Sequence, residues 1–286
     1  MRIVTWNVAR RRSRLAEQAA ALAGRAPDVV ALQEITYRTL PLWRAALETI
    51  GMADVRTSLD RPDPSRVPAA RRQTGVALGS RTSLSDASAL PVPWPETAIA
   101  AVAPLAAAGP VEIHCVHVPN AANGWVKVRT LEAIREGLAT APRVPRVLCG
   151  DLNTPRRELP DGEVVSFARD SRGRLRPERE SEWDRAELGV VPGLRELGYR
   201  DAFRSLHGYA HREPSWTWRR IAGHEGGWRL DHLFASEELQ PVSAIYHHAW
   251  REEGLSDHSA LEVDLQGRAP QIPPGSRAPR VYGSTG

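Results

Sequence analysis

Cysteine is scarce in this chain, which has only Cys115 and Cys149 among its 286 residues. Both lie inside apolar runs, and they do not form the closely spaced pair of thiols that a zinc site uses. We therefore expect two small buried side chains and no disulfide, as in a protein of a reducing compartment.

Lysine is scarcer still, because Lys127 is the only one and every other basic side chain is arginine. Arginine suits bidentate contacts with phosphate, but a chain rich in Ala, Arg, Gly and Pro also fits a GC-rich coding bias. The net charge of +4 is compatible with a polyanionic partner and does not demonstrate one. Arginine clusters at 10–14 and 71–75 adjoin predicted strand ends, where they could meet a substrate or form an ordinary solvated face.

The chain also lacks a long apolar run. The most apolar later stretch, at 97–109, is too short to cross a bilayer and contains Pro104, so we expect no membrane helix. No signal-like segment precedes the strand-like opening "MRIVTWN", which favours a cytoplasmic location.

The composition, 42% hydrophobic and 25% charged, describes a globular chain that can bury a full core. Apolar runs recur without a dividing linker or an internal repeat, which indicates one domain over 1–266. Residues 267–286 lack apolar content and are expected to form a flexible tail. Nothing in the sequence implies a protein partner, so we expect a monomer.

Hydrophobic periodicity predicts more strands than helices. Helices are expected at 13–24, 39–50 and 125–139, the last with Val128, Leu131, Ile134 and Leu138 on one stripe. Strands are expected at 2–6, 28–33, 75–79, 98–103, 111–117, 146–149, 215–218, 229–235, 241–248 and 260–265. Loops are expected at 55–74 and 153–192, the second with a short helix around 183–188.

Several apolar runs carry an oxygen-bearing or imidazole side chain at one end. These side chains are Asn7, Glu34, His117, Asp151, Asn153, Asp231, Asp257 and His258. Strands of a twisted sheet share an edge, so such ends can converge although they are far apart in the sequence. Singly, each residue has an ordinary explanation, such as a turn, a cap or a hydrogen-bonded core histidine. The ordered set as a whole favours one site.

Carboxylates and amides with imidazoles and no cysteine suit a hard divalent cation, Mg²⁺ or alternatively Mn²⁺, better than zinc. Such an ion takes one or two protein carboxylates together with phosphate oxygens, which leaves other acids and a histidine for proton transfer. This division of labour favours phosphoester hydrolysis.

The motifs "WN", "LQE", "GDLN", "RLDH" and "SDH", in this order over roughly residues 1–265, resemble the endonuclease/exonuclease/phosphatase superfamily. That superfamily includes deoxyribonuclease I, the exonuclease III type AP endonucleases and phosphatases of inositol lipids. The resemblance implies an α/β fold, namely a four-layer α/β sandwich of two mostly antiparallel sheets packed face to face with helices outside. It also implies a magnesium-dependent phosphoester hydrolase.

The resemblance also implies which residues bind the metal ion and which position the attacking water. Glu34 would be the principal metal ligand, with Asn7 and Asp257 close to the same ion or to the phosphate. Asp151 and Asn153 would position and polarise the attacking water or the leaving oxygen.

The resemblance also implies roles for the imidazoles. His258 would contact the scissile phosphate and be oriented by Asp231 through its other ring nitrogen. His117 would lie near the leaving group. The general base is either Asp151 or His258, and the sequence leaves both open.

The substrate is suggested by "GYRDAFRSLHG", "SWTWRR" and "GWRLDHLFAS", which resemble the exonuclease III branch and favour nucleic acid, above all DNA. Arg129, Trp216 and Trp218 are candidates for substrate contact, although alternating tryptophans also fit cross-strand packing. The stretch "VARRRSR" after Asn7 departs from the Asn-Gly-Ile-Arg signature of AP endonucleases, so abasic-site specificity is not implied. The alternatives are a phosphomonoesterase or small-molecule phosphodiesterase with the same site, and a binding module without catalysis.

Overall fold

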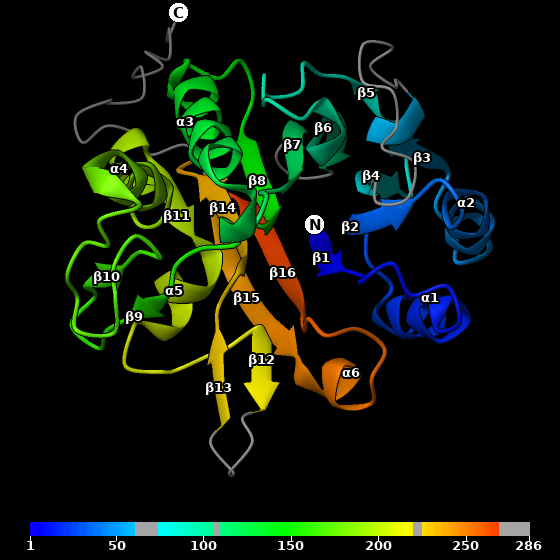
Figure 1. Ribbon diagram of the computed structural model, residues 1–286. Helices are drawn as coiled ribbons and strands as arrows, with labels where there is room; N and C mark the ends of the chain where they lie inside the picture. Colours follow the sequence, from blue (N-terminus) through cyan, green and yellow to red (C-terminus); the bar gives the residue numbers. More distant parts are fainter. Residues whose placement is uncertain (61–73, 106–108, 220–224, 269–286) are drawn as a thin grey trace, which may run out of the picture.

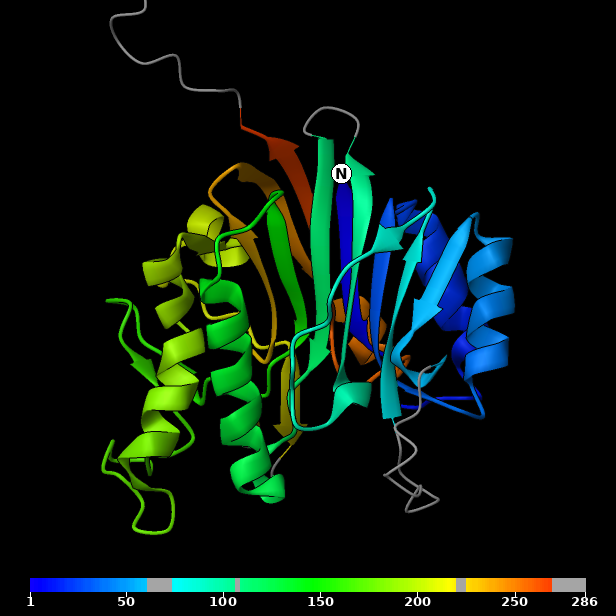
Figure 2. The same ribbon diagram turned by 90° about the horizontal axis from the view of Figure 1, so that it is seen from above.

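The computed structural model describes residues 1–60, 74–105, 109–219 and 225–268. Within them the chain forms four layers, in which two six-stranded sheets lie face to face between two layers of helices (Figure 1, Figure 2). This confirms the four-layer α/β sandwich that the resemblance implies.

The first sheet has β1 and β2 at its centre. In spatial order its strands are β15 (Leu239–His247), β16 (Ala260–Gly267), β1 (Arg2–Asn7), β2 (Val29–Thr36), β4 (Thr74–Ser80) and β3 (Asp54–Thr57). The second sheet has β8 and β7 at its centre. Its order is β11 (Tyr199–Asp201), β14 (Asp231–Ser236), β8 (Arg146–Asp151), β7 (Gly109–His117), β6 (Ala98–Leu105) and β5 (Ser85–Asp86).

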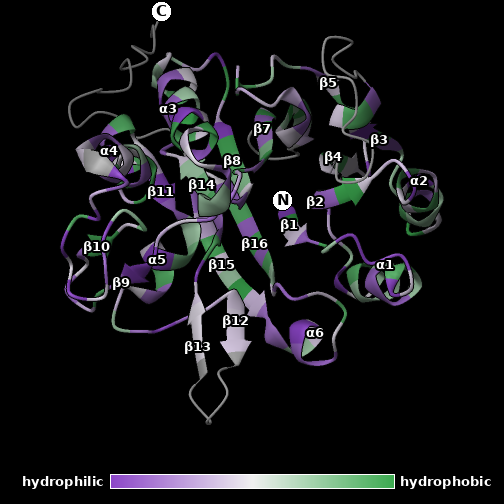
Figure 3. Cartoon of the chain, in the orientation of Figure 1, coloured by the Kyte–Doolittle hydropathy of each residue, from purple (hydrophilic) through white to green (hydrophobic). Residues whose placement is uncertain are grey.

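Two short antiparallel ribbons lie outside these sheets. One pairs β9 (Arg157–Glu158) with β10 (Val164–Val165), and the other pairs β12 (Trp216–Arg219) with β13 (Glu225–Trp228). The β12–β13 ribbon extends from the lower edge of the molecule in Figure 1. It is largely pale in Figure 3, whereas β8 and β16 carry clearly green segments where their apolar residues lie.

Each large sheet is antiparallel except for its central pair, β1 with β2 and β7 with β8. A parallel pair needs a crossover connection, and helices α1 (Leu15–Arg25) and α3 (Trp125–Ala139) supply the two crossovers. Because parallel strands end at the same edge, the carboxyl ends of β1 and β2 lie together, and so do those of β7 and β8. The polar residues at these four ends are thereby placed side by side in pairs.

The helices cover the outer faces of the sheets through apolar stripes. In α1 the buried residues Leu15, Gln18, Ala19 and Leu22 recur at helical spacing. The stripe expected on α3, with Val128, Leu131, Ile134 and Leu138, is confirmed, since all four are buried. The other helices are α2 (Leu40–Thr49), α4 (Glu180–Val190), α5 (Ala202–His207) and α6 (His248–Glu252), with 3₁₀ turns at Ser58–Asp60, Pro95–Thr97, Ala121–Asn123 and Gly193–Leu197. Within the described ranges, no helix combines the length and the apolar character that a membrane crossing requires.

The main core lies between the two sheets, where side chains such as Ile3 and Val29 meet Ile113 and Val147. Cys115 and Cys149 belong to this core and are both free, which confirms the expectation of buried thiols without a disulfide. Burial raises the pKa of the Cys115 thiol to about 12, so it stays protonated.

Two expected loops contain regular structure. The loop expected at 55–74 begins inside β3, which pairs with β4, and its residues 61–73 lie outside the described part of the chain. The loop expected at 153–192 holds the β9–β10 ribbon and α4, which is longer than the short helix expected at 183–188. The expected tail starts within β16, which runs to Gly267, and residues 269–286 also lie outside the described part.

The strand expected at 229–235 is wrong at its start, since β13 ends at residue 228 and β14 begins at residue 231. The Arg229 side chain turns inward at this break and binds the Glu158 carboxylate. The backbone N–H groups of Leu230 and Asp231 donate to Ser215 Oγ at 2.9 and 3.1 Å instead of to a neighbouring strand. The strand expected to run to residue 248 likewise stops at residue 247, where α6 begins.

Candidate active site

The polar ends of the central strands meet at a cleft of about 760 Å³. Among the residues that line it are Glu34, His117, Asp151, Asn153, Trp216, Asp257 and His258. Asn7 and Asp231 lie buried directly behind this lining. Segments as far apart in the sequence as those that carry Asn7 and His258 are thus brought to one place, as the strand-end pattern predicts.

Asp151 is the centre of the site. It ends β8 and pairs in register with His117 of β7 on one side and with Asp231 of β14 on the other, so the three side chains are neighbours. His117 Nε2 lies 3.7 Å from Asp151 Oδ2. Gly150 permits the close approach of these strands, because its φ is +137° and a Cβ there would lie 1.9 Å from the Val116 carbonyl oxygen. The glycine of the "GDLN" motif is therefore required for the packing of β8 against β7.

Asn7 joins the two sheets at the base of the cleft. Its Nδ2 donates to Asp151 Oδ2 at 3.0 Å and to Glu34 Oε1 at 3.3 Å. The backbone N–H of Ala9 donates to Asn7 Oδ1 at 3.0 Å, which favours this orientation of the amide. In this arrangement Asn7 spaces the two carboxylates, and its amide nitrogen rather than its oxygen faces them.

A β-bulge directs Glu34 into the cleft. The pairing of β2 with β4 shifts register between Leu32 and Ile35, and Glu34 has a φ of +59°. A non-glycine residue in this left-handed region costs about 1 kcal/mol or more, and such positions concentrate at functional sites. Glu34 Oε2 lies 3.0 Å from Nε of Arg10, which belongs to the predicted arginine cluster at 10–14.

His258 and Asp231 form a buried pair. His258 Nδ1 lies 2.7 Å from Asp231 Oδ2, and its Nε2 lies 3.9 Å from Asp151 Oδ2. Burial alone would lower the pKa of His258, but the negative charges of Asp231 and Asp151 outweigh it and raise this pKa to about 10. Burial raises the pKa of Asp151 above its ordinary value, against the lowering effect of the nearby His258.

The backbone around His258 is tied to β1. The indole N–H of Trp6 donates to the His258 carbonyl oxygen at 3.0 Å. Ser256 Oγ donates to the Asn7 carbonyl oxygen at 2.6 Å and accepts the N–H of His258 at 3.2 Å. The position of the imidazole is therefore set by the strand that also carries Asn7.

Asn153 follows Asp151 in a left-handed conformation, with a φ of +50°. Its backbone N–H donates to Asp151 Oδ1 at 2.9 Å. Behind the loop, Lys127 Nζ donates to the Asn153 carbonyl oxygen at 2.8 Å and to Glu187 Oε1 at 2.6 Å. The side chains of Lys127 and Glu187 are both fully buried, so the only lysine of the chain supports the loop that carries Asn153.

The donor set fits a hard cation. Glu34, Asp151, Asp231 and Asp257 bring four carboxylates to one place, against the imidazoles of His117 and His258 and the half-exposed Arg10. Asp231 Oδ1 is buried and has no hydrogen-bond partner within the described part of the chain. Asp151, Asp231 and His258 place ligand atoms within 4.8 Å of one another, but the Nδ1 of His258 is already taken by Asp231. Glu34, Asp151 and Asp257 are among the carboxylates that line the cleft and are thus better placed to hold an ion.

The three candidates for substrate contact, unlike the catalytic candidates, do not all lie at the cleft. Trp216 lines the cleft, and its Nε1 donates to Asp257 Oδ2 at 3.4 Å. Trp218 lines a neighbouring cavity. Arg129 is exposed on α3 and is not among the residues that line the cleft.

Solved structures of other proteins share this architecture. The fold is similar to that of an AP endonuclease from Archaeoglobus fulgidus, with a TM-score of 0.68, 23% identity and coverage of 93% of this chain and 99% of the other. It is also similar to TDP2 from D. rerio in complex with a single-strand DNA product, with a TM-score of 0.63, 14% identity and coverage of 93% and 98%. At these identities the likeness establishes the fold.

The family follows from the sequence match. The model described as "Endonuclease/Exonuclease/phosphatase family" matches residues 4–258, and the chain belongs to this family. DNA repair nuclease APEX1 of Danio rerio is 33% identical over 134 residues, a stretch that covers 44% of this chain and 39% of that protein. This sequence match agrees with the exonuclease III type branch expected from the C-terminal motifs.

Sequence reasoning missed the residues that support the site from behind. Ser256 and the Lys127–Glu187 pair hold catalytic candidates in place without opening on the cleft. A signal for Lys127 was available, because a single lysine among so many arginines suggests a position where the bulkier guanidinium does not fit. No comparable signal in one sequence separates Glu187 from other helical glutamates.

Proposed function

We propose that this protein is a divalent-metal-dependent phosphodiesterase, and specifically a nuclease that hydrolyses phosphodiester bonds in DNA. The observation that carries the proposal is the meeting of Asp151, the Asp231–His258 pair and Glu34 around one cleft, with more carboxylates than nearby cations. Family membership supports phosphoester hydrolysis as the reaction class.

A bound Mg²⁺ or Mn²⁺ would neutralise the carboxylates and polarise a phosphate oxygen or a water molecule. Glu34 and Asp257 would hold it, with Asp151 close by. Asn7 keeps the carboxylates of Glu34 and Asp151 apart and oriented, because its amide donates to both.

The proton chemistry is divided between Asp151 and His258. Two carboxylates flank the ring of His258, which favours the protonated form and makes its Nε2 a donor to a phosphate oxygen. Asp151 is acceptor to the Asn7 amide and the Asn153 backbone N–H and is the better candidate for the base that takes a proton from water. His117 lies 3.7 Å from Asp151 and is placed to assist the leaving oxygen.

DNA is proposed as the substrate for two reasons. The relatives named above include a DNA repair nuclease and a protein in complex with a single-strand DNA product. The cleft also joins a surface of tryptophans and arginines, which is typical of proteins that bind single-stranded or distorted nucleic acid. The monomeric state, the cytoplasmic location and the lack of a protein partner stay predictions from the sequence.

The test is a substrate panel with purified protein and Mg²⁺, comparing abasic duplex, plasmid, single-stranded DNA, RNA and an aryl phosphate monoester. We expect cleaved DNA strands, no release of inorganic phosphate, and no reaction with chelator. Release of inorganic phosphate from the monoester without strand cleavage would instead make the protein a phosphomonoesterase. Salt-sensitive DNA binding without turnover of any substrate would contradict an enzymatic role.

A further inference from the structure

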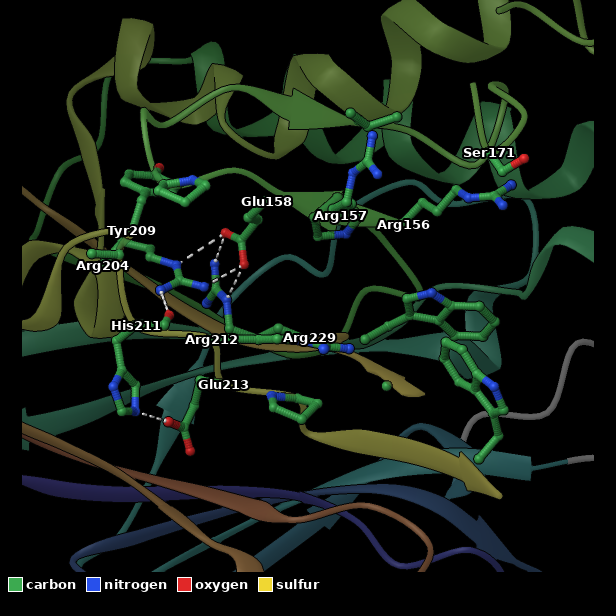
Figure 4. Close-up of a pocket in the computed structure, with 18 of the residues that line it drawn as sticks. Arg156, Arg157, Glu158, Ser171, Arg204, Tyr209, His211, Arg212, Glu213 and Arg229 are labelled. Carbon is green, nitrogen blue, oxygen red and sulfur yellow. Dashed lines mark hydrogen bonds and ion pairs between the residues drawn. The ribbon is translucent and has the colours of Figure 1, made fainter. Parts of the chain in front are cut away.

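A second cavity, of about 490 Å³, adjoins the cleft. It lies between the β9–β10 ribbon, the segment at 209–214 and the β12–β13 ribbon, and Figure 4 shows the arginines that surround it. We call it the arginine pocket and define it by Arg156, Arg157, Arg212 and the paired Arg204 and Arg229. None of the catalytic candidates lines it.

Two of these arginines are already neutralised. Glu158 lies between Arg204 and Arg229 and accepts hydrogen bonds from both, with shortest distances of 2.7 and 2.6 Å (Figure 4). Arg229 also binds Asp201 at 2.6 Å. Their side chains are no more than 5% exposed, so they form the wall of the pocket rather than free cations.

The remaining acids of the lining are also occupied. Asp170 is bound by Arg174 at 2.8 Å, and Glu213 forms ion pairs with His211 and His248. Among the described residues, each carboxylate of the lining therefore already has a basic partner.

Arg156, Arg157 and Arg212 form no ion pair with any residue in the described part of the chain. Arg156 donates to the Arg169 carbonyl oxygen at 2.9 Å, and among the described residues Arg157 and Arg212 have no hydrogen-bonded or ion-paired partner. Burial and then repulsion from Arg176 and Arg157 lower the pKa of Arg156 below its ordinary value. Asp170 attracts Arg156 but is itself bound by Arg174. Three guanidinium groups that form no ion pair within the described residues therefore surround one cavity, which suits an anion.

Tryptophan rings connect this pocket with the cleft. Trp228 lines both cavities, Trp216 lines the cleft and Trp218 lines the arginine pocket. The ring centroids of Trp216 and Trp228 are 5.1 Å apart, and the two ring planes are nearly parallel. The ring centroids of Trp218 and Trp228 are 4.4 Å apart. The packing is fixed, because Trp218 covers Gly226, where a Cβ would lie 2.1 Å from the ring.

We propose that the arginine pocket binds a backbone phosphate of a nucleic-acid strand whose scissile phosphate lies in the cleft, with the strand passing over Trp216, Trp218 and Trp228. The chemistry points to a chain of phosphates rather than one, since two cavities with phosphate-binding groups share an aromatic wall on which bases can stack. This inference rests on the proposed function. It adds that the enzyme selects a polynucleotide over a small phosphodiester through the arginine pocket.

The test compares two substrates in the double variant Arg157→Ala/Arg212→Ala. One substrate is a single-stranded oligonucleotide, and the other is bis(p-nitrophenyl) phosphate, which is too small to reach both cavities. We expect KM for the oligonucleotide to rise about tenfold or more, because two charge-assisted phosphate contacts are lost. The slope of log KM against the logarithm of the salt concentration should fall by about 1 for each lost contact. Turnover of the small diester should stay within about twofold of the wild type.

The matched control is Arg143→Ala/Arg195→Ala, which removes the same charge from exposed positions. Arg143 precedes β8 and Arg195 precedes β11, whose neighbouring ends lie at the opposite edge of the sheet from Asp151. The control should leave both substrates and the salt slope nearly unchanged.

The outcomes separate this inference from the proposed function. If the wild type cleaves the oligonucleotide and both double variants behave alike, the phosphate site is wrong and the nuclease proposal stands. If the wild type cleaves only the small diester and does not bind the oligonucleotide, both are overturned. If neither substrate reacts but the pocket variant alone weakens oligonucleotide binding, the pocket is supported and the catalytic proposal fails.

Discussion

Two buried clusters of charged side chains lie near each other in this molecule, and they differ in the balance of negative and positive charge. In the first, Glu158 and Asp201 face Arg204 and Arg229, so two negative charges meet two positive ones at distances down to 2.6 Å. In the second cluster, at the candidate active site, Asp151 and Asp231 flank the imidazole of His258, and further carboxylates lie alongside with the imidazole of His117.

The effect on the carboxyl groups is opposite in the two places. Burial favours the neutral acid in both. Around Glu158 the two arginines outweigh burial and lower the pKa to about 2, whereas around Asp151 burial prevails and the pKa is raised. A balanced cluster stabilises the fold, and an unbalanced one retains the capacity to bind a cation and to accept a proton.

The largest expected effect lies in the unbalanced cluster. Asp151→Asn should lower kcat by about 10³-fold to 10⁴-fold, because it removes the proposed base from a site that is otherwise intact. The melting temperature should not fall, since an uncharged amide replaces a buried carboxylate that lacks a full counter-charge. Steady-state kinetics and thermal unfolding of the same preparation check this. Activity within tenfold of the wild type would remove Asp151 from the mechanism.

A substitution in the balanced cluster should lower the free energy of unfolding rather than kcat. Glu158→Gln leaves two buried guanidinium groups with one carboxylate, and breaking a buried pair in this way costs about 3–5 kcal/mol of unfolding free energy. The folded variant should keep kcat for a small diester within a few-fold of the wild type, because Glu158 does not line the cleft. Denaturant unfolding at pH 7 measures the loss.

The pH dependence sharpens the same prediction. Because the pKa of Glu158 is lowered to about 2, its stabilisation is fully present above the unfolded-state pKa and is lost as pH falls. Between about pH 5 and pH 2 the wild type should lose roughly 3 kcal/mol through this group, and Glu158→Gln should lose correspondingly less. Parallel curves for the two proteins would show that Glu158 does not titrate as its surroundings imply.

The contrast between the two clusters also shows which features of the site could be predicted from the sequence. The convergence of Asn7, Glu34, Asp151 and His258 was predictable, because each lies at one end of an apolar run and the ends of neighbouring strands share an edge of the sheet. The four layers followed from the resemblance carried by those motifs. The roles of these residues remain predictions.

The balanced cluster could not be predicted in this way. Arg229 stands within an apolar run, and only the break between β13 and β14 turns it inward toward Glu158, 71 residues away. Glu158 itself lies in a stretch rich in Pro and charge that predicts a loop. A pair of charges that meet only in three dimensions leaves no periodic signal, whereas strand ends do.

The smallest effect concerns the cation itself. If the surplus of carboxylates is a metal site, Mg²⁺ should stabilise the folded protein by about 2.7 kcal/mol at one hundred times its dissociation constant. Glu34→Gln should abolish most of this gain, since Glu34 is the proposed principal ligand that opens on the cleft. The matched control Glu136→Gln, at an exposed position on α3, should keep it in full. Thermal unfolding with and without Mg²⁺ measures the gain independently of turnover. Equal stabilisation of all three proteins would place the ion elsewhere, and the imbalance around Asp151 would then need another explanation.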